Sequence, residues 1–404
     1  MTVTTTRRGM MAGVAASSTL LLGTARAVAE DGVTLTEIKL GQTVALSGPA
    51  SAFSSYGRVM TGFFQKINDE GGINGRKVNF TLLDNAFSPP KALEQTRRLV
   101  EDVGVFAEVG TVGTTPNVAV QKYLNDRKVP HLYISAGGRR FNDPKNFPYT
   151  VPLYPAFEME GAVLGRYVLK TRPNAKIGVL YQNDDFGRDF LRGLKTGLGE
   201  RVSMIVAEMA HEITDPTVDS QLLKLNSAGV DTLFEFTTPK FAAQAIRKAN
   251  EIGWRPLQLL ASPASSIEAT LRPAGFEAAK DIVVTTQFSK QAGDPTWDND
   301  KEMNDFKAFM KKYAPNDSPS DFIALSGYII AHGIELALRR CGPDLTRENV
   351  IKQATSLKDV RLPLFLPGIT ISNSPEDYSA YSALQIATFD GTRWVATGGI
   401  VSGR

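Results

Sequence analysis

The stretch "YISAGGRR" places two arginines directly after an apolar strand and a pair of glycines. Glycines let a backbone come close to a ligand because they carry no Cβ atom. A guanidinium at such a place can hold a carboxylate through two parallel hydrogen bonds. We therefore expect Gly137, Gly138 and Arg139 to contact an anionic ligand. The alternative is that Arg139 and Arg140 lie on the rim of the fold and pair with acids such as Asp143.

A second stretch, "GTVGTTPN", is typical of a helix N-terminus that binds a carboxylate. The N–H groups of a first helical turn have no acceptor inside the helix, so they are free to bind an anion. Thr115 suits the capping position and Pro116 the first helical position. The hydroxyls of Thr114 and Thr115 can add donors, and Gly113 allows a close approach. An ordinary capped helix is the alternative.

Two aromatic residues open helices at matching places in the two halves of the chain. Tyr56 precedes Gly57 after the first strand, and Phe186 precedes Gly187 after the strand "KIGVLYQN". If a pseudo-two-fold axis relates the halves, the two rings face each other across a cleft. The alternative is that each ring packs against the start of its own helix.

The sequence contains no group of residues typical of catalysis or of metal binding. His131, His211 and His332 are far apart and lack the spacing of metal ligands. No glycine-rich dinucleotide motif, phosphate-binding lysine motif or serine elbow appears. Asp184 and Asp185 stand before a helix, where acids more often cap than act as an acid–base pair. We expect no cofactor and no metal, and an exported enzyme is the weaker alternative.

Strand patterns alternate with helical patterns along most of the chain. "IKLGQTVAL", "KVNFTLLDN", "VFAEVGT" and "VPHLYIS" form a first series, in which "PPKALEQTRRLVEDVG" has the period of an amphipathic helix. A second series begins near Pro152 with "KIGVLYQN", "SMIVAEMAHE", "DTLFEFT", "LQLLASP" and "DIVVTTQF". Such alternation predicts parallel sheets covered by helices on both faces. We expect an α/β protein of two doubly wound lobes that are hinged near Val151 and Thr286, with ligands bound beyond the carboxyl ends of the strands.

Residues 1–29 have the pattern of a secretory signal peptide. A charged start precedes an apolar stretch from Met10 to Leu22, and small-residue cleavage patterns end at Ala27 or Ala29. "TRRGMM" also resembles a twin-arginine signal. The apolar stretch is shorter than the ~20 residues that span a bilayer, so we expect export rather than a membrane anchor.

The charge of the chain limits the classes of partner, and its cysteine content limits how the fold can be stabilised. The formal net charge is +3, and loss of Arg7, Arg8 and Arg26 with the signal peptide brings it to zero. A neutral mature chain is not a typical partner of nucleic acid. Cys341 is the only cysteine, so the fold cannot contain an internal disulfide and must depend on its core. No later stretch of 18 apolar residues appears, so we expect a soluble mature protein.

Six segments in order resemble one family of binding proteins: "IKLGQTVALSGPAS", "INDEGGINGRKVNF", "DNAFSPPKALEQTRRLVED", "VPHLYIS", "KIGVLYQNDDFGRDF" and "ATFDGTRWV". The chain is similar over nearly its whole mature length to the periplasmic solute-binding proteins of branched-chain amino-acid ABC importers, the type I leucine-binding class. The resemblance implies two Rossmann-like lobes that are joined by three hinge crossovers and trap a ligand as they close. The third crossover falls near residues 364–368. The first lobe is then residues 36–151 with 287–364, and the second is residues 152–286 with 365–404.

The resemblance also implies which residues bind the ligand. Family members hold an amino-acid carboxylate with hydroxyl and backbone donors in the elements that match "GTVGTTPN" and "SAGGRR". Arg139 and Arg140 depart from the small and hydroxyl residues usual in the second element. The residues that match the remaining family elements are Tyr56, Phe186, Thr237 and Thr238.

The position of the acid that pairs with a ligand ammonium falls in "LLASPASS", where Ala264 stands and no acid comes before Glu268. Its absence favours a carboxylate without an amino group, such as an aromatic or aliphatic acid. A branched-chain or other amino acid is the alternative. We expect a monomeric, exported component of an ABC importer that delivers its ligand to a permease in the inner membrane. A receptor that senses the same ligand is the second alternative.

Overall fold

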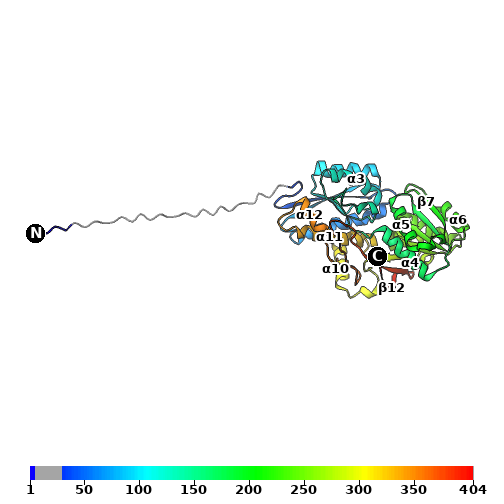
Figure 1. Ribbon diagram of the computed structural model, residues 1–404. Helices are drawn as coiled ribbons and strands as arrows, with labels where there is room; N and C mark the ends of the chain where they lie inside the picture. The colour runs from blue at the N-terminus through cyan, green and yellow to red at the C-terminus, as the bar shows by residue number, and fades with distance from the viewer. Residues whose placement is uncertain (5–29, 404) are drawn as a thin grey trace.

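The computed structural model describes residues 1–4 and 30–403, and the helices and strands between Glu37 and Ser402 form two α/β lobes (Figure 1). Each lobe is built on one sheet. The strand order is β2-β1-β3-β4-β5 in the first sheet and β12-β11-β10-β9-β8-β6-β7 in the second. The signal peptide predicted for residues 1–29 falls almost entirely outside the described residues.

All neighbouring strands of the first sheet run parallel. Its strands are β1 (Glu37–Val44), β2 (Lys77–Asp84), β3 (Ala107–Val109), β4 (His131–Ile134) and β5 (Thr150–Pro152). Helices α2 and α3 pack together, while α1, α10, α11 and α12 form a second packed group that contacts the same sheet. Figure 1 shows α3 on the opposite side of the sheet from α10, α11 and α12. The helices of this lobe are α1 (Ser54–Asp69), α2 (Pro89–Arg97) with its π-helical continuation (Arg98–Val103), α3 (Thr114–Asp126), α10 (Lys301–Tyr313), α11 (Phe322–Arg340) and α12 (Arg347–Ala354).

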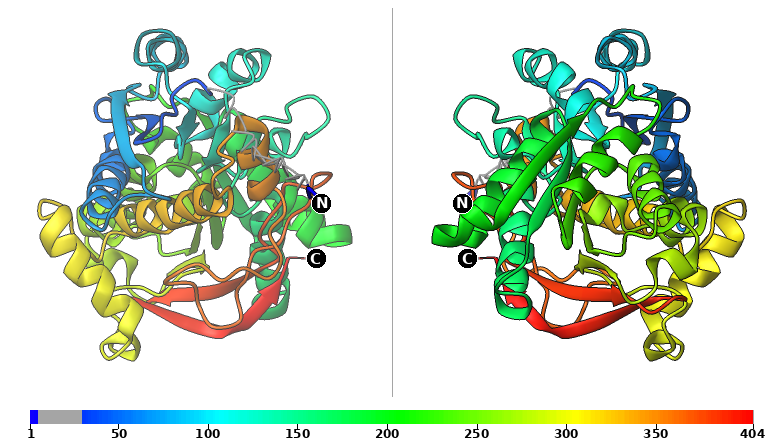
Figure 2. Two further views of the ribbon diagram at one scale, coloured as in Figure 1. Left: turned by 90° about the vertical axis from the view of Figure 1, so that its left-hand side faces the viewer. Right: turned by 90° about the vertical axis from the view of Figure 1, so that its right-hand side faces the viewer.

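The second sheet is parallel through five strands and ends in an antiparallel hairpin. The parallel strands are β6 (Ile177–Gln182), β7 (Ile205–His211), β8 (Thr232–Phe236), β9 (Leu257–Leu260) and β10 (Val283–Gln287). The hairpin is β11 (Ala383–Phe389) and β12 (Trp394–Ser402). Both views of Figure 2 show it in red at one margin of the molecule, where β12 is an edge strand. The helices are α4 (Phe157–Thr171), α5 (Asp185–Leu198), α6 (Asp219–Ser227), α7 (Pro239–Glu251), α8 (Arg272–Ala274) and α9 (Phe276–Ala279).

The predicted α/β class and parallel sheets are therefore confirmed, with the hairpin as an unpredicted addition. Helix α7 illustrates why the pattern predicts the fold. Phe241, Ala245 and Ala249 lie on one face at helical spacing and are completely buried. Gly253 follows with a φ of 68°, a left-handed conformation that stops a helix.

The chain passes between the lobes in three segments. Residues 153–156 join β5 to α4, residues 288–300 join β10 to α10, and residues 355–382 join α12 to β11. The second and third segments run side by side, since the N–H of Lys290 donates to Leu364 at 2.7 Å and that of Leu366 donates to Phe288 at 3.0 Å. These backbone bonds connect two of the three segments that join the lobes.

Helix α11 is a core helix of the first lobe. Among the described residues it is the only helix with the length and the apolar composition of a membrane span. Its central window is 78% buried inside the protein, as expected when a helix packs against α1 and β4. The sequence reading missed this run because Ser326, His332 and Glu335 interrupt it.

Helices α4 and α5 approach each other through glycines. A Cβ atom on Gly161 would lie 2.3 Å from the carbonyl oxygen of Phe190, and one on Gly193 would lie 2.1 Å from that of Glu158. Both distances are shorter than a van der Waals contact, so the two backbones can touch only without side chains there. This close contact fixes the first turns of α4 and α5, which carry Phe157 and Phe186.

We expect Gly193→Ala to lower the free energy of unfolding by about 1–3 kcal/mol, the usual cost of overpacking. This loss is expected even though alanine stabilises a helix by ~1 kcal/mol relative to glycine. Urea denaturation measures the change. Gly399→Ala is the matched control, because nothing lies within 4 Å of its Cβ position. Equal stability of the two variants would contradict the close packing of α4 and α5.

Candidate ligand-binding site

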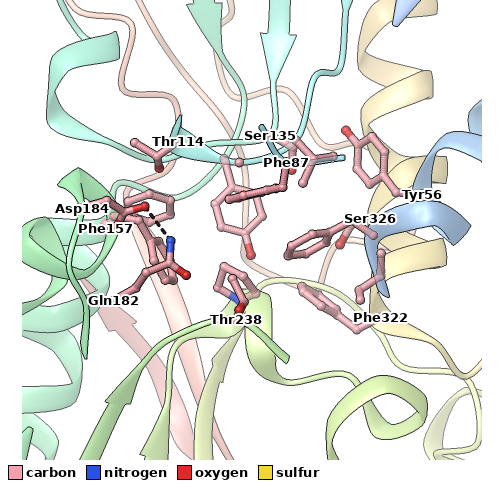
Figure 3. Close-up of a pocket in the computed structure, with 17 residues that line it drawn as sticks. Tyr56, Phe87, Thr114, Ser135, Phe157, Gln182, Asp184, Thr238, Phe322 and Ser326 are labelled. Atoms are coloured by element: carbon pink, nitrogen blue, oxygen red, sulfur yellow. Dashed lines mark hydrogen bonds between the residues drawn. The ribbon is translucent and has the colours of Figure 1, made fainter. Parts of the chain in front are cut away.

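A narrow cavity lies where the carboxyl ends of the strands of both sheets meet (Figure 3). Seventeen residues line it, and its free volume is about 50 Å³. They come from the end of β6 and from the segments after β1, β2, β3, β4, β5, β6, β8 and β9, together with the start of α4 and of α11. This is the place where parallel α/β sheets bind ligands.

Seven of the seventeen residues that line the cavity are aromatic. The rings are those of Phe53, Tyr56, Phe87, Tyr154, Phe157, Phe186 and Phe322. Phe53 stacks on Phe87 with a centroid distance of 6.2 Å, and Phe157 meets Phe186 edge-on at 5.1 Å. A ligand in this cavity would be surrounded by apolar rings over most of its surface.

Five polar side-chain atoms of the lining residues have no hydrogen-bond partner in the described protein. They are Tyr56 Oη, Thr114 Oγ1, Gln182 Oε1, Thr238 Oγ1 and Ser326 Oγ. A buried polar atom without a partner is costly, so its occurrence at a cavity points to a ligand that supplies one. None of the cavity-lining residues is a lysine, arginine or histidine, so hydroxyl and backbone groups are the available donors.

The N-terminus of α3 opens on this cavity. Gly113 precedes it with a φ of 94°, and a Cβ atom there would lie 2.3 Å from the ring of Phe87. The helix begins at Thr114, earlier than the expected start at Pro116, so the prediction that Thr115 is the cap is wrong. No side chain caps α3, which leaves its first N–H groups free of an internal acceptor.

Thr115 instead makes a contact between the lobes. Its hydroxyl donates to Asp184 Oδ2 at 2.9 Å. Asp184 is the cap of α5, because its Oδ1 accepts the N–H of Gly187 at 3.2 Å, as its position in the sequence predicted. Gln182 also donates to Oδ2, at 2.6 Å (Figure 3). Burial raises the pKa of Asp184, and these donors oppose the rise.

A second bridge between the lobes is formed by Asp321 of the first lobe, which is 7% exposed. Its Oδ2 accepts from Ser55 at 2.7 Å, and its Oδ1 accepts from Ser266 of the second lobe at 2.8 Å. Burial raises the pKa of Asp321. The two bridges lie between lobes that are closed on the cavity, so a ligand can enter only when the lobes part or side chains move.

Tyr56 and Phe186 line the cavity from opposite lobes. Phe186 also packs edge-on against Phe190 at 5.3 Å, and burial raises the pKa of Tyr56 well above its usual range. Each ring is thus buried in its own lobe and also lines the cavity, while no ring contact joins Tyr56 to Phe186 among the described residues, so their facing each other stays a prediction.

The structure does not place Arg139 in this cavity. Its side chain is 70% exposed and lies 4.0 Å from Glu158, while its backbone N–H donates to Asp189 at 2.8 Å. Arg140 pairs with Asp185 at 3.2 Å rather than with Asp143. The arginines thus lie on the rim, where they contact acids of the other lobe, and the expected grip on a carboxylate is not supported.

The two glycines before Arg139 have structural reasons. A Cβ atom on Gly137 would lie 1.9 Å from the carbonyl oxygen of Pro155, so glycine is needed for two backbone segments to cross. Gly138 lies against the ring of Phe141. Neither glycine lines the aromatic cavity.

The remaining candidates divide between the cavity and the core. Thr238 lines the cavity, but the hydroxyl of Thr237 is bonded to His211 Nε2 at 2.7 Å behind it. Ala264 is completely buried in the core of the second lobe, and its neighbour Pro263 lines the cavity instead.

Several lining residues were missed by the sequence analysis. Ser135 and Gln182 stand at or after the carboxyl ends of β4 and β6, so the rule that ligands bind there could have found them. Phe87 and Phe322 have no such signal. Phe87 has a φ of 56° in the loop after β2, and Phe322 opens α11, which follows the last parallel strand in the sequence.

No group of three or more histidine, cysteine or acidic residues within the described ranges could hold a metal ion. Two of the three histidines contact other side chains, and the third is buried. His211 contacts Thr237, His332 lies 3.4 Å from Glu335, and His131 is buried without a partner for either ring nitrogen.

Comparison with known proteins agrees with this geometry. The model of the family described as periplasmic binding protein matches residues 37–393. Leu/Ile/Val-binding protein homolog 7 of Brucella suis is 25% identical over 80% of this chain and 82% of its own length.

Solved structures share the fold. A branched chain amino acid ABC transporter protein from Thermus thermophilus with bound valine is 17% identical, with a TM-score of 0.79 over 92% of this chain and 97% of that one. A fatty acid ABC transporter substrate-binding protein from Thermomonospora curvata is 20% identical, with a TM-score of 0.75 over 92% of this chain and 94% of that one. With the family match, the two lobes and the cavity between them, the chain belongs to the periplasmic binding protein family and is a type I member of the leucine-binding type.

Proposed function

We propose that this chain is the exported substrate-binding component of an ABC importer and that it captures a small carboxylate without an amino group. The observation that carries the proposal is the cavity, which combines aromatic walls with unpartnered hydroxyls and the open end of a helix. In this account the closed lobes hold the ligand away from water until they dock on a membrane permease.

The carboxylate would bind at the start of α3. The Thr114 hydroxyl and the first N–H groups of that helix are donors without partners, and a helix N-terminus favours an anion. The ligand's apolar body would then lie among the rings of Phe53, Phe87 and Phe322.

The acid at the cavity is poorly suited to bind an ammonium group. Asp184 lines the cavity, but it already accepts hydrogen bonds from Gly187, Thr115 and Gln182. An ammonium would add a fourth donor to a carboxylate that holds α5 and the other lobe. This supports an acid without an amino group.

An amino acid is the second candidate, and Gln182 is the observation that favours it. Gln182 Oε1 is an unpartnered acceptor at the cavity and suits an N–H or O–H donor of the ligand. The neighbours named above contain both ligand classes, a bound valine in one and fatty acid in the name of the other. A hydroxylated acid would satisfy Gln182 equally well.

The proposed function requires that the chain be exported to the periplasm. The family is periplasmic, and we propose that residues 1–29 direct the chain there and are removed. The mature protein would then begin near Glu30 and act as a monomer.

We expect benzoate or hexanoate to raise the melting temperature of the purified protein more than leucine or valine does. At 100 times the Kd a ligand adds about 2.7 kcal/mol to the free energy of unfolding. A thermal-shift series with all four compounds makes the comparison. Stabilisation by leucine alone would replace the proposed ligand class with amino acids.

We expect Thr114→Val to weaken binding of the carboxylate by about 1–3 kcal/mol, the value of a hydrogen bond to a charged group. Its unfolding free energy should not fall, because the hydroxyl has no partner without ligand. Calorimetry and urea denaturation measure the two quantities. Arg139→Ala is the control and should leave the Kd unchanged. A large rise of the Kd in Arg139→Ala would indicate that Arg139 contacts the ligand after all.

A further inference from the structure

Glu160, Ser262 and Tyr154 form a chain of hydrogen bonds that runs from a buried carboxyl group to the wall of the cavity. Glu160 on α4 is completely buried. Its Oε1 accepts the N–H of Ser262 at 2.6 Å, and its Oε2 accepts the Ser262 hydroxyl at 2.8 Å. Ser262 Oγ lies 2.8 Å from the hydroxyl of Tyr154, which lines the cavity. The chain of bonds therefore ends where a ligand would lie.

The charge of Glu160 fixes the direction of every bond in this chain. An ionised carboxylate only accepts, so the single hydroxyl proton of Ser262 points to Glu160. Ser262 Oγ must then accept the proton of Tyr154. In this state Tyr154 has only lone pairs to offer to the cavity, and it repels a carboxylate.

Protonation of Glu160 reverses the direction. Oε1 is occupied by the N–H of Ser262, so the added proton resides on Oε2 and is donated to Ser262 Oγ. Ser262 then donates to Tyr154, whose own proton is free to turn into the cavity. In this state Tyr154 is a donor for a carboxylate.

The surroundings of Glu160 allow both states near neutral pH. Burial raises the pKa of Glu160 to about 7, and hydrogen bonds from Thr286 and Ser262 oppose the rise. Helix α4 packs against α5, β10 and β11. Neither β10 nor β11 contains an ionisable side chain.

The charged groups that α5 brings to α4 are paired elsewhere. Arg192 bonds to Glu158 at 2.6 Å and to Asp189 at 2.8 Å. Among the described residues no cation forms an ion pair with Glu160. The ionisable groups on its cavity side are Tyr154 and, beyond it, Tyr56 and Tyr381.

Tyr154 also provides contact with solvent. It lines a second, polar cavity of about 600 Å³, whose walls include Arg139, Asp185 and Asp189. Because Tyr154 lines both cavities, we take the polar one as the source of the proton.

We propose that Glu160 decides, through Ser262, whether Tyr154 donates or accepts at the cavity, so that binding of a carboxylate is coupled to uptake of one proton from solvent. The proton ends on Glu160 Oε2, and the two hydroxyls each pass or rotate one proton, so no other group changes charge. This inference rests on the proposed carboxylate ligand. Glu160 is a positioning residue here, and Tyr154 contacts the ligand.

Calorimetry with benzoate and hexanoate between pH 6 and pH 9, in buffers of different ionisation enthalpy, tests the coupling. These acids have pKa values of ~4, as carboxyl groups do, and stay ionised throughout. Affinity is full below the pKa of Glu160 in the free protein. Above pH 7 the Kd should rise about tenfold per pH unit, with uptake of up to one proton per ligand.

Two variants test whether Glu160 and Tyr154 cause the pH dependence of the Kd. Glu160→Gln holds the chain in the neutral direction, since its amide donates to Ser262 Oγ, so its Kd at pH 9 should stay within about twofold of that at pH 6. Tyr154→Phe should bind at pH 6 as weakly as the wild type binds at pH 9, without proton uptake. Thermal unfolding checks that both variants fold.

The outcomes separate the coupling from the function on which it rests. Binding of either acid with the same Kd at pH 6 and pH 9, and without proton uptake, overturns the coupling alone. A pH dependence that survives in Glu160→Gln also overturns it and assigns the titration to another acid, such as Asp184. If neither acid binds at any pH, the proposed function falls together with the coupling.

Discussion

The closed structure depends on one requirement, namely that polar groups buried between the lobes find partners on the opposite lobe. Asp184 and Asp321 do this with the side chains of Thr115 and Ser266, and Asp189 does it with the backbone N–H of Arg139. Burial raises the pKa of all three acids, so each bond must offset the loss of hydration. When the lobes part, water can replace these bonds at little cost.

The bridges also place the binding groups. Asp184 caps α5 and holds Thr115, so it fixes the start of α3 beside the start of α5. The glycine contact between α4 and α5 then brings Phe157 and Phe186 to the cavity wall. Tyr154 lies in the first segment between the lobes, and Ser262 ties it to Glu160. Positions in the cavity and in the hinge are thus set by the same contacts.

The sequence was a good guide to features that repeat along the chain and a poor guide to contacts between distant segments. Alternating strand and helix patterns predicted both sheets, because each element shows its buried face in its own spacing. Gly113, Thr114 and Thr238 could be placed beside the cavity because each follows a strand of a parallel sheet. The hairpin of β11 and β12 lacked such a repeat, as it closes the sheet from the far end of the chain.

Arg139 shows the limit most clearly. Its place after Gly137 and Gly138 fits a ligand site, yet those glycines serve a backbone crossing and a ring contact inside the protein. The acids that face Arg139 and Arg140 lie on α4 and α5, and no local pattern indicates them. Phe87 and Phe322 were missed for the same reason. The structure brings them to the cavity through the loop after β2 and the packing of α11.

The most direct test of the account measures the distance between the lobes. Spin labels at Lys122→Cys on α3 and Arg247→Cys on α7 would report it by pulsed electron resonance, and Cys341 is buried and would remain unlabelled. Closure on the ligand predicts a broad distribution without ligand and a single, shorter distance with a saturating carboxylate. The same distribution in both states would contradict closure of the lobes on the ligand.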